Sequence, residues 1–335
     1  MFSMKKIIRS TEFYVFLTII ILGVVIQARS GQFFTGNNLV DLIRSMVIPA
    51  MFAIGAQIVI VSGGIDVSFT AIASLAMYVA ATSLANYQGS VFAAYAIGAG
   101  LGLLMGLLNA ILIAKFKFPT LIVTLGTASV FTGFMQGVLG AHETPVPAPM
   151  LAHGKAKLFS AYNEQLGVKS DMPVTILLLI ALIILAYFLL RYTMLGRGIY
   201  AVGGDVVSAQ RAGFNVFAIQ FFIYSFVGVL AGITGIARAS MMLNAHPTNL
   251  LGMEMTVIAA VVLGGTRVTG GTGRLIGTML GVALMTIMSN SLILLGIPTY
   301  WQKVFTGAII LIGTGVSAYQ VVRSKNRILN LQRES

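Results

Sequence analysis

Few residues in this chain have types and spacing that could carry out chemistry. The 335 residues include three histidines and no cysteine, so thiolate catalysis, disulfides and Cys-ligated metals are excluded. His142, His153 and His246 lie between apolar runs, and no two of them have the i,i+4 spacing of a helical zinc site. There is no Gly-x-Ser-x-Gly motif, and the acids within apolar runs are isolated, which argues against an embedded hydrolase. We therefore expect no catalytic residues and no metal site.

A glycine-rich stretch at 271–277 has some likeness to a nucleotide-binding loop. Its spacing is Gly-x-Gly-x-x-x-Gly, no predicted strand precedes it, and the chain has no Gly-Lys-Ser/Thr sequence. The chain is therefore expected to bind no ATP and no cofactor of its own. Glycines recur every four residues here, at Gly273, Gly277 and Gly281, and again at Gly98, Gly102 and Gly106. Close helix packing in lipid explains such rows better than a ligand site does.

The elements that must position these residues are membrane spans. The composition is 57% apolar and only 9% charged, whereas soluble domains carry about 25% charge. The formal charge of +12 does not indicate nucleic acid, because the basic residues lie mostly at the ends of apolar runs, where they orient a membrane protein. Ten segments are long enough or nearly long enough to cross a bilayer: 13–28, 42–62, 67–86, 91–114, 119–140, 173–191, 216–237, 253–266, 274–296 and 303–322. They predict an all-α polytopic protein with one transmembrane domain over 13–322.

Charge counting orients this domain. The first segment follows Lys5, Lys6 and Arg9, and we interpret it as an uncleaved anchor rather than a signal peptide, because Gln27-Ala28-Arg29 is a poor cleavage site. The eighth segment is short and could be re-entrant. If it crosses, 14 of the 21 cations are cytoplasmic; if it does not, only 9 are. The positive-inside rule therefore favours ten crossings, with residues 1–12 and 323–335 in the cytoplasm.

Three polar regions separate the spans. The external loop 141–172 contains Pro145, Pro147 and Pro149, so we expect it to be extended rather than a folded domain. The loops 192–215 and 266–273 are predicted to be cytoplasmic. Within 192–215, Asp205 is a plausible N-cap and Gly213 a left-handed terminator, which predicts a two-turn helix over 206–212. This helix lies at the membrane surface, where either a partner protein or the lipid headgroups could contact it.

Two glycine pairs suggest that the chain has paired halves. The stretches 59–68 and 261–269 can be aligned on Gly63-Gly64 and Gly264-Gly265, and both end a span on the cytoplasmic side. Asp66 then stands opposite Arg267. The match is short, so the internal duplication is a weak hypothesis.

Four motifs carry a resemblance to a known family. They are Ser62-Gly-Gly-Ile-Asp-Val-Ser68, the stretch 196–205 with Arg211-Ala-Gly213, the stretch 252–266, and Gly270-Gly-Thr-Gly273; Leu295–Gln302 fits a final hairpin. In this order they resemble the membrane subunits of bacterial ABC importers for monosaccharides, the ribose, xylose and arabinose permease family. The resemblance extends from about Asn37 to Ala318 and so covers nearly the whole chain.

This resemblance implies a type II-like permease of the bacterial inner membrane. It would pair with a second copy or a paralogue, receive sugar from an extracytoplasmic binding protein, and be driven by a separate ATPase subunit that holds ATP and magnesium. The helix at 205–212 would then be the coupling helix, with Gly204, Asp205, Ser208, Arg211 and Gly213 at the ATPase contact. The family usually has Asn at position 205 and Val-Gly at 69–70, where this chain has Phe69-Thr70. Because of the departure at 69–70, the resemblance does not identify the sugar.

Polar residues within spans are candidates for the translocation path. They are Gln57, Asn109, Gln136, Ser289 and Asn290; each could contact sugar hydroxyls or join helices to one another. Asp66 and Glu254 are expected to have structural roles, with Asp66 capping the third span and Glu254 opening the eighth. A proton- or ion-coupled secondary transporter is the alternative function. It would be expected to have buried ionisable residues and helices broken at mid-membrane, and this chain has few of the former.

Overall fold

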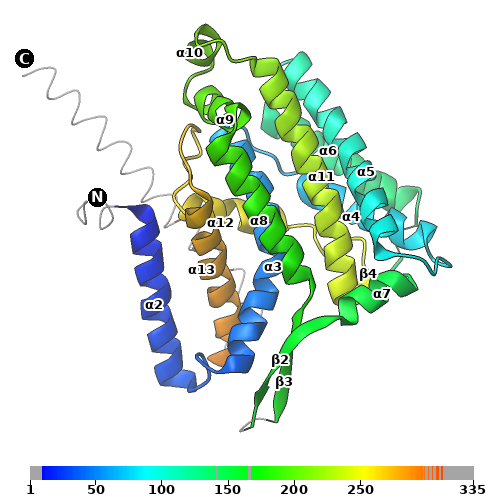
Figure 1. The fold of residues 1–335 in the computed structure, drawn as a ribbon, viewed down its shortest axis with the longest axis vertical. Coiled ribbons are helices and arrows are strands. Elements are labelled where there is room, and N and C mark those ends of the chain that lie inside the picture. Colours follow the sequence, from blue (N-terminus) through cyan, green and yellow to red (C-terminus); the bar gives the residue numbers. More distant parts are fainter. Residues whose placement is uncertain are drawn as a thin grey trace, which may run out of the picture.

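The structure is a computed structural model that describes residues 10–296 except 141, 165 and 166, together with 298, 301, 304, 307, 308 and 311. Helices dominate it (Figure 1). The helices of the predicted spans are α2 (Thr11–Ser30), α3 (Gly36–Val61), α4 (Phe69–Ser83), α5 (Val91–Ala110) with its π-helical extension η1 (Ile111–Lys115), α6 (Thr120–Gly137), α8 (Thr175–Tyr192), α11 (Val216–Met242), α12 (Met253–Leu263) and α13 (Leu275–Leu294). They match the first nine predicted segments. The tenth, 303–322, lies outside the continuously described part of the chain.

Helix lengths support a membrane location. Five helical segments of the described chain are long and apolar enough to cross a bilayer: α2, α3, α5 with η1, α8 and α11. Helices α4 and α12 are also apolar but contain fewer than 18 residues. The apolar stretch counted in α13, Leu275–Ser291, is likewise shorter than 18 residues. Helix α3 forms the centre, because nearly all of its side chains from Val47 to Val61 are buried and it contacts α8, α11, α12 and α13.

The glycine row of α5 allows very close packing against α11. A Cβ added at Gly102 would lie 2.1 Å from the carbonyl oxygen of Gly228, and one at Gly98 would lie 2.9 Å from that of Gly232. The row on α13 works in the same way, since a Cβ at Gly277 would lie 2.1 Å from the carbonyl oxygen of Gly264 on α12. Both rows therefore serve helix packing within one chain, as the sequence predicts.

The polar region 141–172 is folded, which corrects the expectation of an extended loop. It forms strand β1 (Thr144–Pro145), helix α7 (Ala148–Lys155) and a hairpin of β2 (Lys157–Asn163) and β3 (Val168–Pro173). Pro149 stands in the first turn of α7, where proline favours a helix start. The hairpin is tied to α3 because Ser170 donates a hydrogen bond to Asp41 at 2.8 Å. The positions of the prolines could not predict tertiary contacts of this kind.

Helix α12 connects the two ends of the bundle. Its eleven residues give a length of about 16 Å, roughly half of the hydrocarbon core. Before it, strand β4 (Asn244–Ala245) pairs with β1, at the end of α11 where α7 lies. After it, the loop 266–273 reaches the opposite end, where Gly271 donates a hydrogen bond to the carbonyl oxygen of Val61 at 2.8 Å.

Candidate functional site

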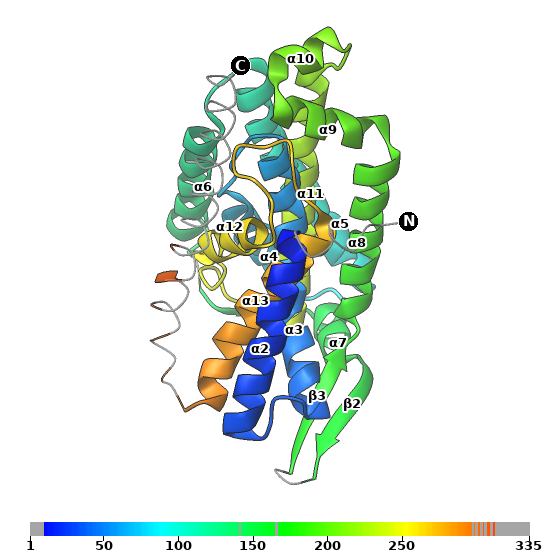
Figure 2. The ribbon, with the colours of Figure 1, turned by 90° about the vertical axis from the view of Figure 1, so that its left-hand side faces the viewer.

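A short helix projects from one end of the bundle, as Figures 1 and 2 show. This is α10 (Val206–Arg211), and Asp205 caps it by accepting the backbone N–H of Ser208 at 2.7 Å. Hydrogen bonding to Ser208 holds the pKa of the Asp205 carboxyl below its usual value. Gly213 has φ +86°, so the left-handed terminator predicted from the sequence is present. The exposed fraction of Val207 is 52%, and Arg211 is also exposed.

Helix α9 (Met194–Gly204) leads into α10, and sequence reasoning missed it. Four of its eleven residues are glycine, a composition that disfavours a helix. The available signals were Thr193, whose hydroxyl caps the helix by accepting the N–H of Gly196 at 3.0 Å, and a buried face that includes Ile199 and Gly203. Two of the glycines lie against neighbouring backbone: an added Cβ would lie 2.4 Å from the carbonyl oxygen of Leu189 at Gly196 and 1.8 Å from that of Val61 at Gly203.

Three backbone segments meet at the base of α10, and we call this contact the glycine junction. It consists of Val61–Gly63 at the end of α3, Gly203–Gly204 at the end of α9, and Gly270–Gly271 in the loop 266–273. A Cβ added at Gly203 would lie 1.8 Å from the carbonyl oxygen of Val61, and one at Gly270 would lie 2.6 Å from that of Gly203. Tyr200 of α9 also donates its hydroxyl to the carbonyl oxygen of Gly273 at 2.8 Å. A displacement of α9 and α10 must therefore move α3 and this loop as well.

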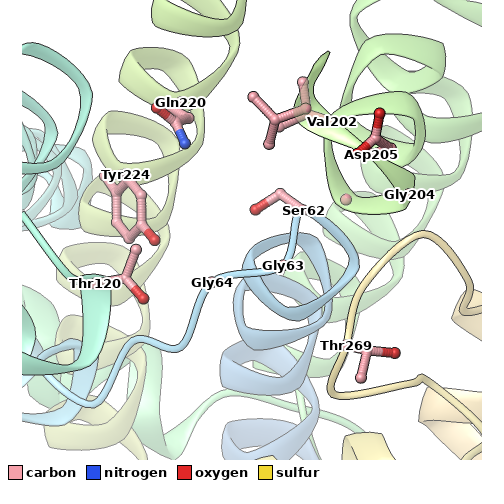
Figure 3. A pocket seen from close by; sticks show the side chains of 12 residues that line it. Ser62, Gly63, Gly64, Thr120, Val202, Gly204, Asp205, Gln220, Tyr224 and Thr269 are labelled. Atoms are coloured by element: carbon pink, nitrogen blue, oxygen red, sulfur yellow. The ribbon is translucent and has the colours of Figure 1, made fainter. Parts of the chain in front are cut away.

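A cavity of about 350 Å³ lies beside the glycine junction. Figure 3 shows it between Gln220, Tyr224 and Thr120 on one side and Ser62, Val202 and Asp205 on the other. Below it, the connection from α3 to α4 is bound to α6. Ile65 donates its N–H to the Thr120 hydroxyl at 3.0 Å, and Val67 donates its N–H to the Thr124 hydroxyl at 3.3 Å.

The ends of α3 and α12 share one backbone motif, which changes the register of the proposed duplication. Gly63 has φ +84° and Gly265 has φ +92°, so these two glycines are equivalent. Gly64 donates its N–H to the carbonyl oxygen of Val59 at 3.1 Å, and Thr266 donates its N–H to that of Val261, the counterpart of Val59 in α12, at 3.3 Å. The sequence alignment paired Gly63 with Gly264 and Gly64 with Gly265, and is therefore displaced by one residue. Gly264 is instead a contact of α13.

The two acids predicted to be structural both lie near the start of α4. Asp66 accepts the N–H and the hydroxyl of Ser68, each at 2.7 Å. Glu254 stands in the first turn of α12 and accepts the Thr70 hydroxyl at 2.9 Å and the N–H of Gly252 at 3.0 Å. The bond from Thr70 joins α4 to α12, a contact that the sequence did not indicate.

The five predicted path residues do not form one group. Gln136 lines a second cavity, of about 410 Å³, and the other four do not. Asn109 donates to the Ser68 hydroxyl at 2.8 Å and Asn290 to the Ser45 hydroxyl at 3.1 Å, so both join helices. Gln57 is fully buried, and its amide has no partner within the described residues. Ser289 is half-buried on α13.

Comparison with known proteins identifies the family. Residues 38–313 match the family described as "Branched-chain amino acid transport system / permease component". The chain belongs to this permease family. No solved structure matches it.

Curated relatives of the permease cover most of both chains. The ribose import permease protein of Escherichia coli (strain K12) is 31% identical over 88% of this chain and 90% of its own. A probable ABC transporter permease protein of the same strain is 34% identical over 90% of this chain and 87% of its own. The autoinducer 2 import system permease protein of Yersinia pseudotuberculosis is 30% identical over 92% and 85%. The resemblance inferred from the sequence motifs is confirmed.

Proposed function

We propose that this permease is the non-catalytic membrane subunit of an ATP-driven importer of a monosaccharide or sugar-like small molecule. An extracytoplasmic binding protein delivers the substrate, and a partner ATPase binds ATP and magnesium. The ribose import permease among its relatives supports the monosaccharide. The family description names branched-chain amino acids instead, so the ligand retained by the cognate binding protein decides between the two substrate classes.

The proposed topology has ten crossings in a bacterial inner membrane with both termini cytoplasmic. Two features support it. Arg197 in α9, Arg211 in α10 and Arg267 in the loop 266–273 belong to the segments that meet at the glycine junction, as the positive-inside rule expects of a cytoplasmic end. The eighth segment, although its helix is short, also connects β4 at one end of the bundle to the glycine junction at the other.

The coupling mechanism follows from the glycine junction, which is the observation that carries this proposal. When the ATPase closes on ATP, it pushes or pulls α10, which is too short to absorb the motion. The motion passes through Gly203 to the end of α3 and to the loop 266–273, because their backbones are in direct contact. Packed interfaces have discrete arrangements, so a small shift at this end changes which packing of the bundle is favoured. The residues proposed to contact the ATPase at the start of this path are Gly204, Asp205, Ser208, Arg211 and Gly213.

Charge reversal on α10 tests the coupling role. Arg211→Glu and Asp205→Lys should reduce co-purification with the ATPase subunit and ATP-coupled uptake, because one reverses the exposed cation and the other removes the cap of α10. Lys155→Glu is the charge-matched control, since Lys155 is exposed on α7 at the opposite end, and it should leave co-purification unchanged. Wild-type behaviour of both α10 variants would contradict the assignment.

An uncoupler separates ATP-driven import from the ion-coupled alternative. With ATP held constant, collapse of the proton gradient should leave uptake unchanged. Loss of uptake under those conditions would instead favour ion coupling through an acid such as Glu254.

A further inference from the structure

Polar side chains line part of the second cavity, although the helices around it are mostly apolar. It has a volume of about 410 Å³, within the range of small-molecule sites, and lies between α4, α6 and α12. Its polar side chains come from all three helices: Thr70, Ser129, Thr132, Gln136 and Glu254. Ser129, Thr132 and Gln136 follow the spacing i, i+3, i+7, so they share one face of α6.

The cavity lies along the half of α6 that is farther from the glycine junction, from Ala128 in the middle of the helix to Gln136, its last residue but one. Helix α6 begins at Thr120, which lines the cavity beside the glycine junction. At 1.5 Å per residue, the stretch from Ala128 to Gln136 lies about 12–24 Å further along the helix axis. The two cavities are separated by the connection from α3 to α4, which is bound to Thr120 and Thr124. A polar cavity at this depth is costly unless water or a polar ligand occupies it.

The polar groups facing the cavity include unused hydrogen-bonding capacity. Glu254 uses Oε2 for Thr70 and Gly252, and Oε1 has no hydrogen bond with any described residue. Within the same residues, the amide of Gln136 and the hydroxyl of Thr132 also make no hydrogen bond with another described group. Figure 2 shows α6 at the edge of the bundle, and its outer face is exposed.

We propose that Gln136, Thr132 and Glu254 contact the sugar during its passage, which rests on the proposed function. A carboxylate accepts hydrogen bonds from hydroxyls, whereas an amide both donates and accepts, so together they match the alternating donors and acceptors of a polyhydroxylated ligand. Of the polar residues named from the sequence, Gln136 is then a path residue and Glu254 has a role beyond opening α12.

The absence of cysteine allows a direct test by thiol labelling. Gln136→Cys is expected to react with a permanently charged methanethiosulfonate reagent in native membranes about tenfold faster than Phe134→Cys, because the charged reagent needs water. Phe134 is the matched control, since it lies only two residues away on the same helix and its exposed fraction is 48%, but it does not line the cavity. Equal reactivity at the two positions would overturn the proposal.

Protection by sugars then distinguishes a sugar contact from a mere water-filled space. A panel of pentoses, hexoses and their deoxy analogues should include at least one that slows labelling of Gln136→Cys while leaving Phe159→Cys on the hairpin unaffected. Protection by sodium ions and by no sugar, or no protection at all, overturns the proposal. In the same membranes, Gln136→Leu should lower uptake about tenfold while co-purification with the ATPase is retained.

The proposed function and the proposed sugar contact can be rejected separately. If wild-type membranes show no ATP-dependent uptake, the proposed function is wrong, whatever the labelling shows. If wild-type uptake depends on ATP and Gln136→Leu, Thr132→Val and Glu254→Gln all transport normally, the function stands and the sugar contact is wrong.

Discussion

At the scale of single residues, side-chain capping and backbone proximity decide what each position tolerates. Asp205 was predicted to cap a surface helix, and its bond to Ser208 has that geometry. Its role at an ATPase contact stays a prediction, as do those of Gly204, Ser208, Arg211 and Gly213. Residue type could identify the capping residue because the backbone N–H that it accepts lies only three residues further along the chain. Residue type could not tell which of the five polar path candidates face a cavity, because that depends on neighbours distant in sequence.

Asp205 offers the first prediction. Asp205→Ala should reduce ATP-coupled uptake because α10 loses its cap, whereas Asp205→Asn should keep uptake close to wild type because Asn caps as well as Asp. The pKa of Asp205 is lowered in the folded protein, so the carboxylate cap is present at neutral pH and is lost only as the pH falls through that lowered value. Uptake in energised cells, normalised to membrane content, measures the effect. Equal uptake by the Ala and Asn variants would contradict it.

At the scale of elements, glycine rows set how closely helices approach. The periodicity of Gly98, Gly102 and Gly106 predicted packing without naming the partner, which is α11. The region 141–172 was predicted least well. Its prolines suggested an extended chain, but α7 packs so closely on α11 that a Cβ at Gly154 would lie 1.8 Å from the carbonyl oxygen of Ser240. Local composition does not reveal such long-range contacts.

The contact of α5 with α11 yields a stability prediction. Gly102→Ala should lower the melting temperature of the purified protein, because the added methyl overpacks the interface at a cost of about 1–3 kcal/mol. Gly100→Ala is the control: nothing lies within 4 Å of its added Cβ, so the better helix propensity of Ala should leave stability equal or higher. A Gly102 variant as stable as the Gly100 variant would show that this close approach is wrong.

The glycine junction yields a coupling prediction at Gly203. Gly203→Ala should reduce ATP-coupled uptake about tenfold, since its methyl would collide with the backbone of Val61 and separate the junction. Gly100→Ala is the control outside the junction and should have little effect, because nothing lies within 4 Å of its added Cβ. ATPase activity of the assembled transporter should persist in the Gly203 variant and become poorly linked to uptake. A normal ratio of uptake to ATP hydrolysis in this variant would argue against transmission through the junction.

At the scale of the whole molecule, the distribution of charge and the helical fold support the proposed orientation. Nine of the ten predicted segments have helical counterparts in the described chain, because long apolar runs in a bilayer must satisfy their own backbone hydrogen bonds. In the proposed topology, the charge of +12 orients the chain in the membrane rather than binding nucleic acid. The sequence predicted that the eighth segment is short, and its helix α12 has only eleven residues.

Single cysteines test this orientation. In intact cells with the outer membrane made permeable, Phe159→Cys on the β2–β3 hairpin should react with a charged thiol reagent added outside, whereas Arg211→Cys should react only after the inner membrane is opened. Both positions are exposed, so a difference in labelling reports sidedness. The reverse pattern would invert the topology.

The central claim is that α10 contacts the ATPase, and proximity labelling tests it most directly. Val207→Cys, on the exposed face of α10, is coupled to a photoactivatable maleimide in membranes that contain the cognate ATPase and binding protein. We expect irradiation to give a covalent adduct with the ATPase subunit at Val207→Cys and none at Phe159→Cys, which lies at the opposite end of the molecule. An ATPase adduct at Phe159→Cys, with none at Val207→Cys, would contradict the account.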